Sequence, residues 1–451
     1  MKALKISLIV ALFALCFTPV FAGGKKDTGA ASSDGKVHLR VLNYYDMTSP
    51  NAVAEIEEIW DAFAKANPDI VIEREDLFGE PFHQKTEAYA AAGDLPDVLY
   101  AWPAGRSSTL HTNHLLKDLS ALTKKDNLAA AYRADVLDPK NQFAQYLGIL
   151  PRTLSVTHAV FVNGEVLKDA GLTVPKTYAE LKAQVPVLKA KGYETFLMAN
   201  SEPWVPQSFI FSMLAGRFGG ADWSERILSG RAKFTDPEFV QALTFFKTLV
   251  DDGVIAKTSL ADSRGDIIGK FANNKGAYYI EGEWRVGNFI TNKSTGEALI
   301  SVARQPNFSV TVFPEIPGVK FNRSSSVTMG TGWGMNANIP DGSAKEAAAW
   351  KLIKWLSGTE VQTYLLKTGG IVTPTVNTIN IASLGLEPLM LKTTQFGKEF
   401  DTSTVVIDSA FHSDVYNPIN DGLQNIVAGS ATPQQTAERV QRAFETWKSQ
   451  Q

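Results

Sequence analysis

The chain has 451 residues, 44% of them hydrophobic and 20% charged, and a formal net charge of −3 at neutral pH. This slightly acidic balance argues against nucleic acid and against anionic lipid as main partners, because both attract basic proteins. The length is sufficient for two domains, each with its own hydrophobic core.

The first 22 residues have the pattern of a secretory signal peptide. Two lysines precede an apolar run over residues 6–17, which is too short to span a bilayer; Pro19 breaks this run, and "VFA" at residues 20–22 offers the cleavage site. We predict cleavage after Ala22; a lipoprotein signal that uses Cys16 is the alternative. Cys16 is the only cysteine, so we expect an exported protein without disulfides, located in a bacterial periplasm. Residues 23–36 are small and polar and predict a flexible leader.

From residue 37 onward, short apolar runs alternate with amphipathic segments. Strands are predicted over residues 37–45, 69–75 and 96–102, because these runs are apolar and are followed by polar or turn-forming residues. Helices are predicted between them, one capped by Ser49 and one over residues 84–94. This alternation predicts parallel strands that are joined by crossover helices.

Capping patterns mark the starts of the later helices. A Ser or Thr followed three residues later by Glu or Gln can satisfy free backbone N–H groups at a helix start. Such pairs predict helices at the following residues: Thr177, Ser343, Thr359 and Thr432. Pro237 after Asp236 predicts another. With at least two α/β regions, the sequence predicts an α/β fold of two lobes, whose ligand would bind at the carboxyl ends of the strands.

Tryptophan and acidic side chains follow several predicted strands. In "AYYIEGEW", residues 277–284, an apolar run ends in two glutamates, a glycine and a tryptophan. A saccharide offers C–H faces that pack on aromatic rings and hydroxyl groups that need polar partners. Similar groups occur at Asp46, Trp102, Trp204 and Trp333. Each ring taken alone is more often a packing residue, so only their joint occurrence favours a sugar site. Trp60, Trp350 and Trp355 lie inside predicted helices and are expected to pack there.

Four stretches occur in a characteristic order: "AAGDLPDVLYAW", "THAVFVNGEVLKDAGLTVPKTYAELKA", "FANNKGAYYIEGEW" and "GTGWGMNANIPDGSAKEAAAWKLIKWLSGTEVQ". In this order and spacing the sequence resembles the extracellular solute-binding proteins of bacterial ABC importers, in the large sugar-binding family that includes maltose-binding protein. The third stretch departs from the family pattern, since Asn274, Lys275 and Gly276 exchange the usual order of glycine and lysine.

The resemblance implies a two-lobed, Venus-flytrap α/β fold with several chain crossings. Lobe 1 would contain residues 37–147 and 310–339, and lobe 2 would contain residues 151–300 and 343–451. A ligand would lie in the cleft between them, with Trp284 stacked on a sugar ring and sandwiching it with Trp102 of the other lobe. The remaining ligand-binding residues are expected to be Trp333, Trp204, Tyr45, Asp46, Glu281 and Arg152.

The expected function is capture of a sugar or oligosaccharide and its delivery to the membrane permease of an ABC importer. The protein would be a monomer without catalytic activity, cofactor or metal. One alternative is a binder of another solute such as a polyamine, because polyamine sites also combine aromatic and acidic groups. The other is an exported glycoside hydrolase, which would need two carboxylates roughly 5–9.5 Å apart. Titration with sugars and polyamines, and a search for hydrolysis products, would separate these classes.

Overall fold

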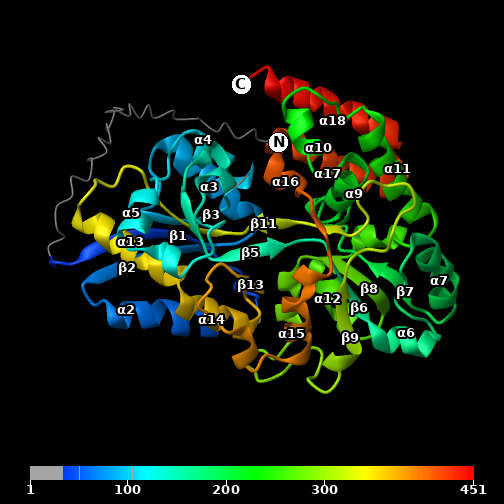
Figure 1. The fold of residues 1–451 in the computed structure, drawn as a ribbon, viewed down its shortest axis with the longest axis horizontal. Coiled ribbons are helices and arrows are strands. Elements are labelled where there is room, and N and C mark those ends of the chain that lie inside the picture. Colours follow the sequence, from blue (N-terminus) through cyan, green and yellow to red (C-terminus); the bar gives the residue numbers. More distant parts are fainter. Residues whose placement is uncertain (1–33, 50, 104, 451) are drawn as a thin grey trace, which may run out of the picture.

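The computed structural model describes residues 34–49, 51–103 and 105–450, which form two α/β lobes joined by extended strands (Figure 1). The predicted fold class is confirmed. The predicted signal peptide, residues 1–22, and most of the predicted leader lie outside the described residues. Within the described part of the chain, no helix combines the length and the apolar character needed to cross a bilayer.

The sheet of the first lobe has five strands in the order β2-β1-β3-β12-β4. They are β1 (Val37–Tyr44), β2 (Ile70–Leu77), β3 (Val98–Ala101), β4 (Ile149–Pro151) and β12 (Gly332–Met335). β1 runs parallel to β2 and β3, as predicted, whereas β12 is antiparallel to both of its neighbours. The carboxyl ends of the other four strands therefore share one edge of the sheet with the start of β12.

One continuous helix follows β1 and is built from α1 (Ala52–Glu55), a π-helical segment (Ile56–Asp61) and α2 (Ala62–Ala66). It begins after Asn51, later than predicted from Ser49. α3 (Glu80–Ala92) ends as predicted at Gly93, whose φ of 66° is the left-handed conformation that glycine adopts readily. Shorter helices follow, α4 (Ser108–Thr112) and α5 (Ser120–Lys125).

The sheet of the second lobe has four strands in the order β7-β8-β6-β9. They are β6 (Ala159–Asn163), β7 (Glu194–Leu197), β8 (Gly276–Glu281) and β9 (Phe308–Thr311). β7 and β8 are parallel, and β6 is antiparallel to β8 and β9. Every residue of β8 is buried, which explains why its sequence is a nearly continuous apolar run rather than an alternating one.

The helices of the second lobe pack on this sheet and extend away from it (Figure 1). α7, α12 and α15 contact β7, β8 and β9 respectively, while α11, α17 and α18 pack on one another. Their bounds are α6 (Gly164–Ala170), α7 (Tyr178–Ala190), α8 (Trp204–Pro206), α9 (Ser212–Gly219), α10 (Trp223–Leu228), α11 (Pro237–Asp251), α12 (Arg264–Ala272), α15 (Pro388–Thr394), α16 (Ile407–Ala410), α17 (Ser413–Ala428) and α18 (Pro433–Lys448).

The capping predictions are confirmed at Thr177, Ser343 and Thr432, whose side chains accept the expected hydrogen bonds at the starts of α7, α13 (Ala344–Leu356) and α18. The helix predicted to start at Thr359 is present as α14 (Thr359–Thr368), but its N-cap is Gly358, so the capping role predicted for Thr359 was wrong. Gln362 does not close a capping box there, because its amide instead donates to the carbonyl oxygen of Ser357 and to the hydroxyl of Thr375.

A small antiparallel sheet joins the lobes. It contains β5 (Thr153–Val156), β11 (Val327–Met329) and β13 (Thr373–Pro374) in the order β11-β5-β13. β5 connects β4 of the first sheet to β6 of the second, and β11 leads back into β12. Figure 1 shows β5 and β11 side by side between the lobes. The chain therefore crosses between the lobes more than once, as the resemblance implied.

The predicted lobe boundaries need two corrections. β9 begins before residue 310, where lobe 1 was expected to resume, and it pairs with β6 in the second sheet. α13 was expected in lobe 2 but packs against β1 and β12 of the first lobe. Both errors have one cause, because the local sequence of an element does not specify which sheet it will join.

Candidate functional site

Aromatic side chains gather at the carboxyl ends of β1 and β3 in the first lobe. Tyr44 ends β1 and Trp102 follows β3, and their ring centroids lie 5.1 Å apart at nearly a right angle. Tyr44 also stacks on Tyr100 at 5.6 Å, and the imidazole of His83 lies 4.9 Å from Trp102. Tyr44 and Trp102 both keep part of their surface exposed. This edge of the sheet therefore offers aromatic faces.

Two tryptophans occupy the corresponding edge of the second lobe. Trp204 begins α8, after the end of β7, and Trp284 follows β8. Phe209 connects them, at 5.3 Å from Trp204 and 6.1 Å from Trp284. Both indoles are partly exposed. The predicted placement of these two rings at strand ends is thus observed.

Gly282 lies directly beneath the indole of Trp284. A Cβ atom added at Gly282 would be 2.2 Å from Cη2 of that ring, a distance that no real contact allows. The backbone there has φ −71°, so glycine is required by the close approach of the ring and not by the backbone conformation. The glycine in "EGEW" therefore positions the tryptophan that follows it.

Arg106 connects the two edges. It lies just beyond β3 in the first lobe, and its Nη2 and Nε donate to Oδ2 of Asp408 on α16 at 2.8 and 3.0 Å. Its guanidinium carbon lies 5.7 Å from the ring centroid of Trp204, and its Nη1 is 3.3 Å from Nε2 of His83. Burial, together with the charge of Arg106, lowers the pKa of His83 to about 4, so the imidazole is neutral at pH 7.

The lobes also touch at a second place. The backbone N–H of Lys293 donates to Oδ1 of Asn51 at 2.7 Å, and Nδ2 of Asn51 donates to the carbonyl oxygen of Thr368 at 3.0 Å. Nζ of Lys293 lies 2.7 Å from Oε1 of Glu58. The helix after β1 thus contacts the loop that follows Trp284, and the two lobes are close together in this structure.

Two of the predicted site residues are packed inside their own lobes. Trp333 is 1% exposed and contacts Trp60 at 5.6 Å and Tyr100 at 5.2 Å, because β12 is an inner strand of the first sheet. Glu281 is fully buried and accepts hydrogen bonds from Tyr279 and Arg285. Neither side chain has surface on which a ligand could lie, so neither is a candidate ligand-binding residue.

The other predicted residues lie near the edge of the first sheet. Tyr45 is 5% exposed and donates to the carbonyl oxygen of Ala52, and Asp46 accepts the backbone N–H of Thr48 at 2.8 Å. Both therefore shape the turn that leads into α1. Arg152 follows β4, and its guanidinium carbon lies 5.2 Å from the ring centroid of Tyr100.

Sequence reasoning missed several polar residues at these edges: His83, Arg106, Arg264 and Asp408. Arg106 lies four residues after Trp102, which ends the quoted "AAGDLPDVLYAW" stretch, so its place after a predicted strand was a usable signal. Asp408 gave no signal in the sequence, because it lies 302 residues from its partner Arg106. Among the described residues no cluster of His, Cys, Asp and Glu could hold a metal ion.

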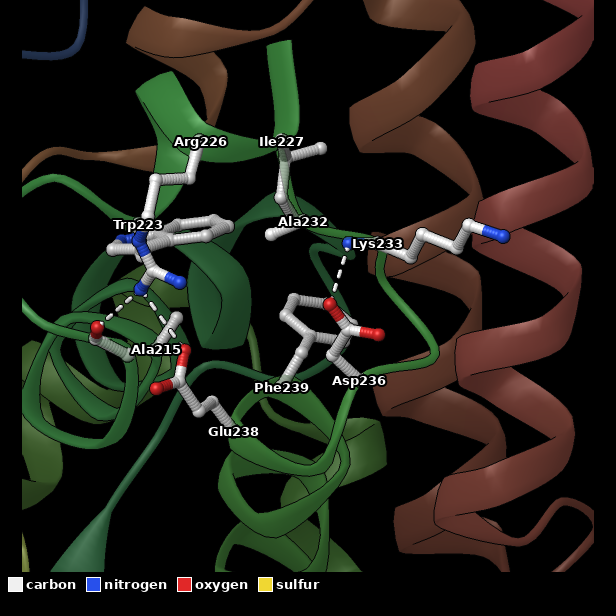
Figure 2. A pocket seen from close by; sticks show the side chains of 10 residues that line it. Ala215, Trp223, Arg226, Ile227, Ala232, Lys233, Asp236, Glu238 and Phe239 are labelled. Atoms are coloured by element: carbon white, nitrogen blue, oxygen red, sulfur yellow. Dashed lines mark hydrogen bonds and ion pairs between the residues drawn. The ribbon is translucent and has the colours of Figure 1, made fainter. Parts of the chain in front are cut away.

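The cavity drawn in Figure 2 lies away from these edges, within the second lobe between α9, α10 and α11. Arg226 crosses beside it, donating to Glu238 at 2.9 Å. The cavity has a volume of about 20 Å³, which is enough for about one water molecule. This cavity is too small for an organic ligand and belongs to the packing of the lobe.

Replacing Gly282 by alanine is expected to displace the indole of Trp284, at a cost of about 1–3 kcal/mol from overpacking. Near-UV circular dichroism of the tryptophans would report the displacement. Gly265→Ala is the matched control, because an added Cβ there would meet its nearest neighbour at 3.8 Å, an ordinary contact. An unchanged spectrum in the Gly282 variant would contradict the assigned packing of the ring.

A family model described as "Bacterial extracellular solute-binding protein" matches residues 58–382, which is more than half of the chain. The chain belongs to this family. The resemblance found in the sequence is therefore confirmed at the level of the family.

Relatives of this bacterial extracellular solute-binding protein include the multiple sugar-binding protein of Streptococcus mutans, which is 23% identical over 332 residues and 69% of each chain. Among solved structures, a chitin oligosaccharide binding protein has a TM-score of 0.80 at 19% identity, covering 92% of this chain and 99% of that one. The maltose/maltodextrin-binding domain of Bdellovibrio bacteriovorus, bound to maltotriose, has a TM-score of 0.69 at 18% identity, covering 92% of this chain and 100% of the domain. These structural likenesses establish the shared two-lobed fold.

Proposed function

We propose that the protein binds a sugar or an oligosaccharide between its lobes and delivers it to the membrane permease of an ABC importer. Membership of the solute-binding family supports the role of a binder, and the sugar-binding names of its relatives support the class of ligand. The ligand would favour the closed arrangement, because only that arrangement lets both lobes contact it.

The observation that carries this proposal is that both sheets have partly exposed aromatic rings at the edges where their strands end. Trp102 lies at the edge of the first sheet, and Trp204 and Trp284 lie at the edge of the second, all partly exposed. Arg106 reaches from the first edge to the ring of Trp204. Rings that pack on C–H faces, with charged groups between them that bind hydroxyls, suit a saccharide.

A polyamine is a poorer candidate because the carboxylates at these edges already have cationic partners. Asp408 accepts two hydrogen bonds from Arg106, and Glu202 lies 3.8 Å from Arg264. A polyamine would need free carboxylates to bind its ammonium groups. Arginine side chains at the same edges would repel it.

A glycoside hydrolase is also poorly supported. Glu281 and Glu283 are 0% and 2% exposed, and each is held by groups of the protein. A pair of catalytic carboxylates must reach a glycosidic bond from both sides. We therefore propose a binding protein without catalysis.

Trp284→Ala is expected to weaken saccharide binding at least about tenfold, because the ring contributes stacking area in the bound state. The apo melting temperature should stay nearly unchanged, since the ring is partly exposed. A thermal-shift screen against mono- and oligosaccharides would identify a ligand, and calorimetry would measure the loss. Trp447→Ala is the matched control, because Trp447 is also partly exposed but lies on α18, stacked on His412. Equal affinities of the two variants would contradict the role of Trp284.

We further propose export to the periplasm by the signal over residues 1–22, with cleavage after Ala22 or lipidation of Cys16, and action as a monomer. The family description "extracellular" supports export. Mass measurement of the mature protein would decide between cleavage and lipidation, and light scattering would report the oligomeric state.

A further inference from the structure

Arg152 and Arg264 have guanidinium groups that donate no hydrogen bond to any described residue, although both side chains are largely buried, at 13% and 21% exposure. The Nε atom of each is fully buried and has no partner. The carboxylate nearest to Arg152 is that of Glu55 at 4.0 Å, and the one nearest to Arg264 is that of Glu202 at 3.8 Å. Both distances exceed that of a hydrogen bond.

A largely buried arginine that donates no side-chain hydrogen bond is unusual in this chain. Within the described ranges, every other buried or partly buried arginine donates at least one side-chain hydrogen bond; Arg106, Arg217 and Arg304 are examples. A buried donor without a partner destabilises a folded protein, and a charged one does so more strongly. Two such groups in one protein point to a partner that binds them.

The two arginines lie at the facing edges of the two lobes. Arg152 follows β4 and lies over Tyr100, while Arg264 begins α12 and lies over the ring of Trp204 at 5.4 Å. Burial raises the pKa of Tyr44 to about 12, and the charges of Arg106 and Arg264 oppose that rise. The charge of Arg264 on the second lobe thus acts on a tyrosine of the first lobe.

The charge balance around these arginines favours an anion. Asp408 is bound by Arg106, and one oxygen of Glu202 accepts the backbone N–H of Arg264 at 3.1 Å. Burial raises the pKa of Glu55 and the charge of Arg152 opposes that rise, but the two groups lie 4.0 Å apart and form no hydrogen bond. A neutral hydroxyl could accept hydrogen bonds, but each arginine would then keep only the carboxylate of Glu55 at 4.0 Å or of Glu202 at 3.8 Å as its counter-charge when water is excluded. A carboxylate supplies charge and accepts two parallel N–H donors.

We propose that the saccharide bound by this protein is acidic, with a uronic acid unit whose carboxylate is bound by Arg264 of one lobe and Arg152 of the other. This inference rests on the proposed function. The aromatic rings that support each guanidinium, Trp204 and Tyr100, would pack beside the sugar and hold the planar donors in place.

The test compares matched pairs of saccharides by thermal shift and calorimetry: digalacturonic acid with galactobiose, and cellobiuronic acid with cellobiose. The acidic member of at least one pair should bind at least about tenfold tighter than its neutral partner, because a charge-assisted bidentate contact is lost in the neutral sugar. The affinity for the acidic sugar should fall with added salt.

Arg264→Gln should lower the affinity for the acidic sugar at least about tenfold and the affinity for its neutral partner less than about threefold. Arg264→Lys keeps the charge and should give an intermediate loss, and the apo melting temperature of each variant would report folding. Arg442→Gln is the control, since Arg442 is exposed. This inference would be overturned, and sugar binding left intact, by either of two results. The first is that neutral sugars bind as tightly as acidic ones in the native protein, and the second is that Arg264→Gln lowers the affinities for acidic and neutral sugars equally. If the protein bound neither the acidic nor the neutral sugars, both this inference and the proposed sugar binding would be overturned.

Discussion

Glu283→Gln is expected to stabilise the protein at neutral and alkaline pH and to remove a pH dependence that the native chain shows. Glu283 is 2% exposed, and no cation approaches its carboxyl group among the described residues. Its partners are the backbone N–H of Val156 on β5, at 3.3 Å, and the hydroxyl of Thr373 on β13, at 3.1 Å. Burial raises the pKa of Glu283 to about 8, and these two hydrogen bonds offset only part of that rise.

The direction of the pH effect follows from this raised pKa. Below the ordinary pKa of 4.5, both the folded and the unfolded chain hold the proton. Between pH 4.5 and about 8 the unfolded chain releases it while the folded protein retains it. The free energy of unfolding therefore falls by up to about 1.4 kcal/mol for each pH unit across this range, and no further above it. Glutamine carries no titrating proton, so the variant lacks this slope.

Urea unfolding between pH 5 and pH 9 would measure the effect. The matched control is Glu165→Gln, because the hydrogen bonds from Arg304 lower the pKa of Glu165 to about 2. The stability that Glu165 contributes is lost only as the pH falls from about 4.5 towards 2, so its removal should leave the slope above pH 5 unchanged. Equal slopes for the native protein and the Glu283 variant would contradict the assignment.

The position of Glu283 also explains part of the sequence pattern "EGEW". The two glutamates are not a sugar-binding pair, because Glu281 belongs to the buried β8 and Glu283 contacts strands of the small sheet that joins the lobes. Only the glycine and the tryptophan act at the edge, with Gly282 leaving room for the ring of Trp284. Four adjacent residues thus have separate tasks that composition alone does not distinguish.

Local signals in the sequence were sufficient for the elements of the fold. The reciprocal capping box of Thr432 and Gln435 and the glycine that ends α3 depend on residues close together in the chain, and both were predicted. The helix after β1 was predicted with the wrong cap, since Asn51, not Ser49, holds the N-cap position although its side chain makes no capping hydrogen bond. The choice between them depends on packing, since Asn51 bonds to Thr368 and Lys293.

The site was predictable only in part because it depends on contacts between distant segments. Trp102, Trp204 and Trp284 could be found, since each follows a strand whose end lies at the expected edge. The burial of Trp333 could not be predicted, because it depends on the position of β12 between β3 and β4. The pairing of Arg106 with Asp408 likewise joins a loop to a helix of the other lobe. The family resemblance supplied the lobes but not these pairs.

Arg217→Met is expected to destabilise the second lobe by about 3–5 kcal/mol, because it leaves two buried carbonyl groups without donors. Arg217 is fully buried on α9, and its Nη1 and Nη2 donate to the carbonyl oxygens of Pro314 and Phe313 at 2.7 and 2.8 Å. Its Nε lies 3.3 Å from the hydroxyl of Ser324. Burial lowers its pKa to about 9, so the group is still charged at neutral pH and its hydrogen bonds are charge-assisted.

The loss would be measured by urea unfolding at pH 7, with Arg231→Met as the control. Arg231 lies in the same lobe, but its ion pair with Glu225 is exposed, so its removal should cost less than about 1 kcal/mol. Methionine retains much of the apolar volume of arginine, which separates the loss of hydrogen bonds from the loss of packing. Similar losses in the two variants would mean that the segment around Pro314 is held by its apolar contacts and not by this guanidinium.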